Sequence, residues 1–131
     1  MTVAIRAFDH VGIRVTDRDR ALAFYADLGF IEVPELSNDR VAEVVSADGV
    51  RLNLIFNGQV RLNNVLLDEP KRWPGYTHAA FIVSRLQDII DWAAARGVPI
   101  TEGPHDWGRR LTCFLRDPDG NVLEFNELRP L

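Results

Sequence analysis

The sequence predicts an α+β fold made of two tandem βαβββ modules. The first observation behind this prediction is a repeat, because residues 9–16 resemble residues 77–84 and each segment carries a histidine in second position. The two histidines, His10 and His78, are 68 residues apart, and Gly29 and Gly97 have the same separation. The second observation is a recurring Asp-Gly turn, at residues 47–49 and 118–120. Self-similarity of this kind indicates repeated structural units.

Each repeat is expected to begin with a strand that leads into a helix. Apolar and polar residues alternate toward the end of Phe8–Val15, which is typical of a strand with one buried face. Thr16 and Ser84 occupy the expected N-cap positions. The helices that follow have apolar stripes at spacings of three and four residues, formed by Ala21, Phe24, Tyr25 and Leu28 and by Leu86, Ile89, Ile90 and Ala93. Gly29 and Gly97 are expected to end the helices in a left-handed conformation.

Three further strands are expected after each helix. In the first repeat they are predicted at Phe30–Val33, Arg40–Ser46 and Val50–Asn57, and in the second at Val98–Thr101, Arg109–Arg116 and Asn121–Glu127. The Asp-Gly turn joins the last two strands of each repeat as a hairpin. The predicted organisation is a first module at 1–57, a linker at 58–76 and a second module at 77–131, folded as one compact domain.

Composition and charge exclude several classes of protein. The chain has 131 residues and a net charge of −4, and no basic stripe indicates a nucleic-acid partner. No run of about 18 apolar residues predicts a membrane span, and the N-terminus does not resemble a signal peptide, so a cytoplasmic protein is expected. Cys113 is the single cysteine, which excludes an intrachain disulfide; it is expected to be buried in its strand.

Strand alternation brings four polar positions to comparable places in the two repeats. His10, Gly12 and Arg14 share one face of the first strand, and His78 has the matching place in the second repeat. Aligning the Asp-Gly turns places Asn53 opposite Glu124, at a separation of 71 residues. A carboxylate flanked by Leu123 and Phe125 is costly to bury unless it is paired or binds a metal. Two histidines and one carboxylate can hold a divalent ion.

The motifs resemble those of the vicinal oxygen chelate superfamily, which includes glyoxalase I, bleomycin-resistance proteins, fosfomycin-resistance enzymes and extradiol dioxygenases. The matching segments are residues 9–15, 23–30, 77–81 and 117–124, so the resemblance covers both modules. It implies that the modules curve into an open, incomplete barrel around a metal or ligand cavity. It also implies that His10, His78 and Glu124 hold one divalent ion, with Glu124 as the catalytic carboxylate.

The same resemblance implies a metal-dependent enzyme whose small substrate chelates through neighbouring oxygens. Iron, manganese, nickel, zinc and cobalt all suit the predicted donors. Asn53 stands where glyoxalase I usually carries a second glutamate, which argues against lactoylglutathione lyase activity. Lyase or isomerase chemistry and ring-cleaving dioxygenase chemistry stay open. Asn53, Arg14 and Trp107 are the candidate substrate contacts.

Other interpretations of these residues stay open as well. An isolated histidine on a strand is more often a structural residue than a ligand, and Glu124 can instead form an ion pair with Arg14. His105, predicted in the loop 103–108, and Tyr76 are the candidates for the second histidine and the tyrosine of extradiol dioxygenases. Trp107 suits a ligand pocket or a dimer interface, and a homodimer is expected because open sheet edges favour pairing. The alternative functions are a non-catalytic small-molecule binder of the bleomycin-resistance type and a metal-binding relic.

Overall fold

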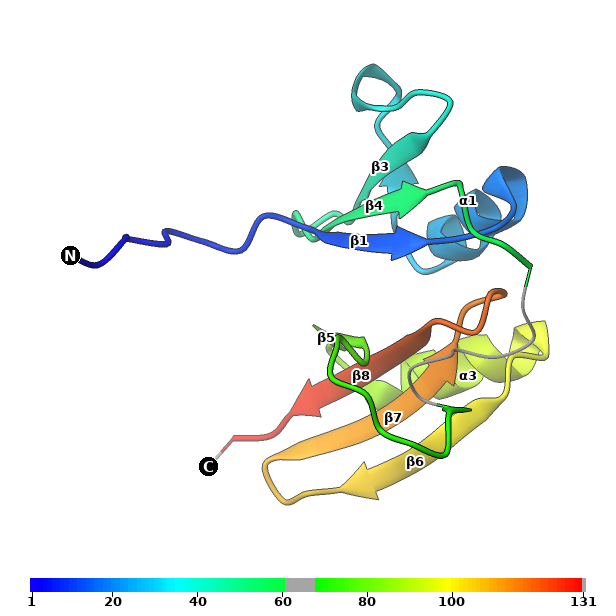
Figure 1. The fold of residues 1–131 in the computed structure, drawn as a ribbon. Helices are drawn as coiled ribbons and strands as arrows, with labels where there is room; N and C mark the ends of the chain where they lie inside the picture. Colours follow the sequence, from blue (N-terminus) through cyan, green and yellow to red (C-terminus); the bar gives the residue numbers. More distant parts are fainter. Residues whose placement is uncertain (61–67, 131) are drawn as a thin grey trace. The chain divides into compact units, whose positions relative to one another are not determined.

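The computed structural model describes residues 1–60 and 68–130, and the chain divides into two compact units, residues 1–59 and 60–131 (Figure 1). The first unit contains β1 (Val11–Arg14), α1 (Arg18–Asp27), β2 (Ile31–Glu32), the 3-10 helix η1 (Pro34–Leu36), β3 (Val41–Val45) and β4 (Arg51–Ile55). The second contains β5 (Ala79–Ile82), α3 (Leu86–Arg96), β6 (Ile100–Asp106), β7 (Arg110–Arg116) and β8 (Val122–Leu128).

The two units repeat the same sheet topology. The strand orders are β1-β4-β3-β2 and β5-β8-β7-β6, and in each sheet the first strand runs parallel to the last strand of its unit. Gly12 pairs with Asn53 in the first sheet, and Ala80 pairs with Glu124 in the second. The 68-residue separation relates Gly12 to Ala80 and the 71-residue separation relates Asn53 to Glu124, so the two pairs are equivalent. The α+β fold of two βαβββ modules is confirmed.

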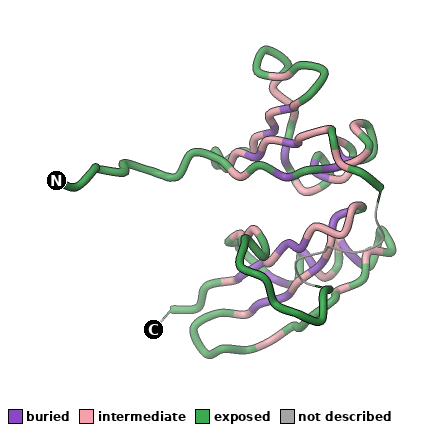
Figure 2. Tube along the Cα trace, viewed as in Figure 1, coloured by how far each residue is buried: buried purple, intermediate pink, exposed green. Residues whose placement is uncertain are grey.

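Each helix lies against one face of its own sheet, and the buried residues alternate accordingly (Figures 1 and 2). In the first unit the fully buried residues include Tyr25 of α1 and Leu52 and Leu54 of β4. In the second unit Leu123 and Phe125 of β8 are buried in the same way. Asn53 and Glu124 alternate with these residues, so both lie on the sheet face away from the helix, as predicted.

The helix N-caps differ from the prediction. The N-cap of α1 is Asp17, whose carboxylate accepts a hydrogen bond of 2.8 Å from the Arg20 amide, and not Thr16. The N-cap position of α3 is Arg85, not Ser84, and the Leu86 amide donates to Glu127 Oε1 at 2.8 Å. A carboxylate from β8 therefore supplies the acceptor that a local cap would otherwise provide.

The helix C-termini and two strand boundaries complete the comparison. Gly29 and Gly97 have φ values of +94° and +66°, which confirms their predicted left-handed conformation. The first strand is shorter than predicted, so His10 immediately precedes β1. β6 is longer than predicted and includes His105, which the sequence placed in a loop. Register shifts near Gly103 allow this edge strand to continue past Pro104.

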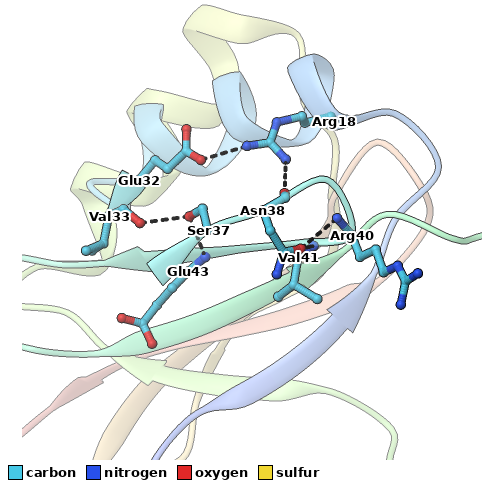
Figure 3. Close-up of polar contacts among 8 residues, drawn as sticks. All are labelled: Arg18, Glu32, Val33, Ser37, Asn38, Arg40, Val41 and Glu43. Atoms are coloured by element: carbon cyan, nitrogen blue, oxygen red, sulfur yellow. Dashed lines mark hydrogen bonds and ion pairs between the residues drawn. The ribbon is translucent and has the colours of Figure 1, made fainter. Parts of the chain in front are cut away.

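A hydrogen-bonded turn leads into β3 in the first unit (Figure 3). Arg18 of α1 donates to the Asn38 carbonyl and to the Glu32 carboxylate, both at 2.8 Å. Ser37 donates to the Val33 carbonyl at 2.8 Å and accepts from the Glu43 amide at 3.2 Å. The Glu43 carboxylate points away from Arg18 and Glu32 in this view, so the turn positions Glu43 on the face that carries Asn53.

Residues 61–67 of the predicted linker lie outside the described residues. Beyond them, Asp68 forms two hydrogen bonds with Arg116 of β7, at 2.8 and 3.0 Å. Trp73 and Tyr76 follow, and Tyr76 is exposed. Across the described residues, no helix has the length and apolar character needed to span a bilayer.

Burial of Cys113 leads to a prediction about alkaline stability. The side chain is buried as predicted, and desolvation raises the pKa of its thiol to about 11 from the usual value of 9.0. Between about pH 9 and pH 11 the unfolded chain loses this proton and the folded chain retains it. The free energy of unfolding is therefore expected to fall with rising pH in this interval. Urea unfolding at several pH values should show a shallower decline for Cys113→Ala; equal declines would contradict the prediction.

Candidate functional site

The second unit brings His78 and Glu124 together. His78 immediately precedes β5, and Glu124 lies on β8, the parallel neighbour of β5. The distance between His78 Nε2 and Glu124 Oε1 is 3.5 Å, and their side chains are 31% and 17% exposed. The Phe114 ring lies edge-on to the imidazole, with centroids 5.4 Å apart. This unit therefore provides two of the three predicted metal donors side by side.

Two residues that the sequence analysis did not single out support Glu124. Asn126 Nδ2 donates to Glu124 Oε2 at 2.8 Å, and Thr112 Oγ1 donates to Asn126 Oδ1 at 2.7 Å. Thr112 and Asn126 are directly opposite each other on β7 and β8, and both are buried. A hydrogen-bonded chain therefore runs from Thr112 through Asn126 to the carboxylate on the face away from α3.

His10 and His78 each have Nδ1 engaged by the residue before it. In the second unit His78 Nδ1 lies 2.8 Å from Thr77 Oγ1. In the first unit His10 Nδ1 lies 2.6 Å from Asp9 Oδ2, and this hydrogen bond lowers the pKa of Asp9. An imidazole whose Nδ1 is held by a neighbour presents Nε2 as its ligand atom, which is the usual arrangement at metal sites.

The first unit places Asn53 at the position equivalent to Glu124. Its side-chain oxygen Oδ1 is buried and, among the described residues, has no hydrogen-bond partner. A buried amide oxygen without a partner is costly, so a ligand that supplies a donor or a positive charge would stabilise this position. Arg14, the other candidate of this unit, donates from Nε to Asn57 Oδ1 at 2.8 Å.

The structure adds a carboxylate beside Asn53. Glu43 of β3 pairs directly with Asn53 in the sheet, and its side chain is 12% exposed. Arg51 Nη2 lies 2.6 Å from Glu43 Oε1, and this hydrogen bond raises the pKa of Arg51. The first unit therefore lacks an acid at Asn53 itself but has one in the adjacent strand.

The histidine candidate His105 lies on the edge strand β6, paired with Thr112 of β7, and Trp107 follows the end of β6. Trp107 is exposed in the hairpin between β6 and β7, near the end of β8. Its ring contacts His105, with centroids 5.1 Å apart, and His105 Nε2 lies 3.4 Å from Glu102 Oε1. β7 lies between β6 and β8, which carries Glu124. The roles of His105 and Trp107 toward a substrate stay predictions.

The candidate metal donors are divided between the two units. Within each unit taken by itself, the described residues bring together no group of three His, Cys, Asp or Glu side chains that would hold a metal. The second unit contributes His78 and Glu124, and the orphaned Asn53 oxygen and the Asp9-supported His10 belong to the first. Imidazole nitrogens, a carboxylate oxygen and an amide oxygen are suitable ligands for a divalent transition-metal ion. The donor types present are therefore chemically suitable for such an ion.

Known proteins share both the sequence pattern and the fold. Residues 7–125 match the family model described as Glyoxalase/Bleomycin resistance protein/Dioxygenase superfamily. The chain is similar to virulence protein STM3117 of Salmonella typhimurium, with 30% identity over 134 residues that cover 94% of this chain and 85% of that protein. Lactoylglutathione lyase of Haemophilus influenzae is 27% identical over 128 residues, which cover 90% of each chain.

A solved structure supports the same relationship. The crystal structure of a glyoxylase/bleomycin resistance protein/dioxygenase domain from Frankia sp. EAN1pec matches with a TM-score of 0.76. The match covers 96% of this chain and 94% of that chain, at 22% identity. It shows a common fold.

Proposed function

The chain belongs to the Glyoxalase/Bleomycin resistance protein/Dioxygenase superfamily, and from that premise we propose that it is a divalent-metal-dependent enzyme. Its substrate is a small molecule that chelates the ion through neighbouring oxygen atoms. His10, His78 and Glu124 would hold the ion, whose identity is iron, manganese, nickel, zinc or cobalt. The superfamily includes many metal-dependent enzymes, and the finer assignments of metal and residues are our proposal.

One observation carries the proposal above all others. His78 Nε2 and Glu124 Oε1 are 3.5 Å apart on adjacent parallel strands, with the far side of each group held by Thr77 and Asn126. The two donor atoms are thus directed by neighbouring hydrogen bonds toward the same place.

The ion, when bound, would supply Lewis acidity toward an enolate, an alkoxide or a catecholate. Glu124 would accept a proton or hold the ion through Oε1, while Asn126 keeps Oε2 occupied. Asn53 would offer its unpartnered Oδ1 to the substrate, and the neighbouring carboxylate, Glu43, is engaged by Arg51. Asn53 in place of a carboxylate disfavours lactoylglutathione lyase chemistry, so another lyase, an isomerase or a ring-cleaving dioxygenase is proposed.

Elemental analysis of protein purified without chelators tests this proposal. The expected result is about one transition-metal ion per chain. Oxygen uptake with a panel of catechols then distinguishes a dioxygenase from a lyase or isomerase. A protein that neither retains nor binds a divalent ion would contradict the proposal and favour a non-catalytic small-molecule binder.

A homodimer is proposed as the state of the protein in solution. β2 and β6 each form an edge of their sheet, and Ile31 of β2 is exposed. Exposed sheet edges favour pairing with a second chain. Light scattering coupled to gel filtration is expected to give twice the chain mass of 14.8 kDa; the mass of a single chain would contradict the dimer.

A further inference from the structure

Two buried polar residues stand out on the sheet face of the second unit that carries Glu124. Thr112 and Asn126 are each 3% exposed, although the neighbouring positions Cys113 and Phe125 are apolar and buried. Burying a hydroxyl and an amide costs free energy unless both are hydrogen-bonded. Apolar residues would pack at these positions without that cost, so the polar pair calls for a purpose other than packing.

The direction of the hydrogen bonds identifies what the pair acts on. Glu124 as a carboxylate only accepts hydrogen bonds, so the Asn126 amide must present its NH2 group to Glu124 Oε2. The Asn126 carbonyl then faces Thr112, whose hydroxyl donates to it. With the amide reversed, its carbonyl would face the carboxylate and two acceptors would meet. The carboxylate therefore sets the orientation of the Asn126 amide, and the Thr112 hydroxyl anchors the other end of that amide by donating to Asn126 Oδ1.

The first unit provides an internal comparison. Its β3 and β4 pair Val41 with Ile55 in the register that pairs Thr112 with Asn126 in the second unit. Asn53 stands there in place of Glu124, and its Oδ1 has no partner among the described residues. The same fold thus uses an apolar pair where the acid is absent and a polar pair where it is present. The sheet itself does not require a polar pair at this position, so we relate the pair to the Glu124 carboxylate.

We propose that Thr112 and Asn126 are positioning residues that make Glu124 present one oxygen, Oε1, toward His78. Asn126 occupies Oε2 at 2.8 Å, and Oε1 lies 3.5 Å from His78 Nε2. The pair would therefore let Glu124 contact a bound ion through Oε1 alone. More coordination positions of that ion would then be open to the two oxygens of a substrate. This inference rests on the proposed metal-dependent function.

The test replaces the pair by the residues that occupy the equivalent places in the first unit. Thr112→Val/Asn126→Ile reproduces the Val41–Ile55 pair, and Thr112→Val alone is the smaller change. Thr112→Ser is the matched control, because it keeps the donating hydroxyl. Binding of Co²⁺ is measured by calorimetry together with the visible spectrum of the bound ion, and thermal unfolding is measured without metal.

The double variant and Thr112→Val are expected to bind Co²⁺ about ten-fold more weakly, as loss of a group that supports a ligand typically does. In the double variant Oε2 loses its Asn126 donor, and in Thr112→Val that donor loses its anchor, so both Co²⁺ spectra should differ from the wild-type spectrum, while the Thr112→Ser spectrum should match it. Wild-type affinity and an unchanged spectrum in both apolar variants would overturn the inference while the proposed function stands. A wild-type protein that binds no Co²⁺, Mn²⁺, Fe²⁺, Ni²⁺ or Zn²⁺ would overturn the proposed function and the inference with it.

Discussion

Replacing Glu124 with glutamine is expected to lower the affinity for Co²⁺ or Mn²⁺ by about 100-fold or more, because changes to groups that merely support a ligand already cost up to about 100-fold. The substitution removes the negative charge 3.5 Å from His78 Nε2 and retains nearly the same volume. Calorimetric titration of the metal-free protein measures the effect. Thermal unfolding without metal should change little, since glutamine can still accept the Asn126 hydrogen bond.

Glu127→Gln is the matched control for that experiment. Glu127 lies on the same strand and undergoes the same change of charge, but its carboxylate accepts from the Leu86 amide at the start of α3. Glutamine keeps an acceptor oxygen for that amide. Equal losses of metal affinity in Glu124→Gln and Glu127→Gln would show that net charge, and not the donor at position 124, governs binding.

Replacing Asn53 with glutamate is expected to lower the thermal stability of the metal-free protein and to increase the stabilisation that metal binding provides. In the metal-free protein the new carboxylate would lie opposite Glu43 in the sheet, and like charges in directly paired positions are destabilising. A loss of about 1 kcal/mol would lower the melting temperature by a few degrees for a chain of this size. With metal, the added anionic donor should increase affinity and hence the stabilisation that binding provides.

Asn53→Gln is the neutral counterpart of nearly the same size. Differential scanning calorimetry with and without Mn²⁺ compares the two variants. The metal-induced rise in melting temperature should be larger for Asn53→Glu than for Asn53→Gln. Equal rises in melting temperature for the two variants would mean that position 53 does not face the ion. Asn53 of β4 would then be removed from the proposed site.

The repeat explains why so much of the fold could be predicted from the sequence. The 68-residue separation makes Gly12 equivalent to Ala80, and the 71-residue separation makes Asn53 equivalent to Glu124. The sheet register agrees, because Gly12 pairs with Asn53 and Ala80 pairs with Glu124. Hydrophobic alternation then assigned the helix-covered faces correctly. The N-caps were wrong at both helices because a cap depends on which acceptor lies nearest, and for α3 that acceptor comes from β8.

The sequence analysis did not identify the residues beside Glu124 and Asn53, although the positions of the two Asp-Gly turns predict which residues pair across the strands. Thr112 and Asn126 are equally far in sequence from Asp119, and Glu43 and Asn53 are equally far from Asp48. A tight hairpin centred on each aspartate therefore predicts both cross-strand pairs, which are the pairs observed. The direction of the Thr112–Asn126–Glu124 hydrogen bonds, in contrast, follows from side-chain geometry that residue spacing does not determine.

The central proposal is that His10, His78 and Glu124 bind one ion, and His10 tests it most directly because it is the only histidine in residues 1–59. We expect the wild type to bind one Mn²⁺ per chain and His10→Gln to bind it about 100-fold more weakly. This loss equals the largest that is typical when a group supporting a metal ligand is removed, about 100-fold. His105→Gln, which changes a histidine on the edge strand β6 that β7 separates from β8, should bind like the wild type. Wild-type affinity and stoichiometry in His10→Gln would contradict a shared site.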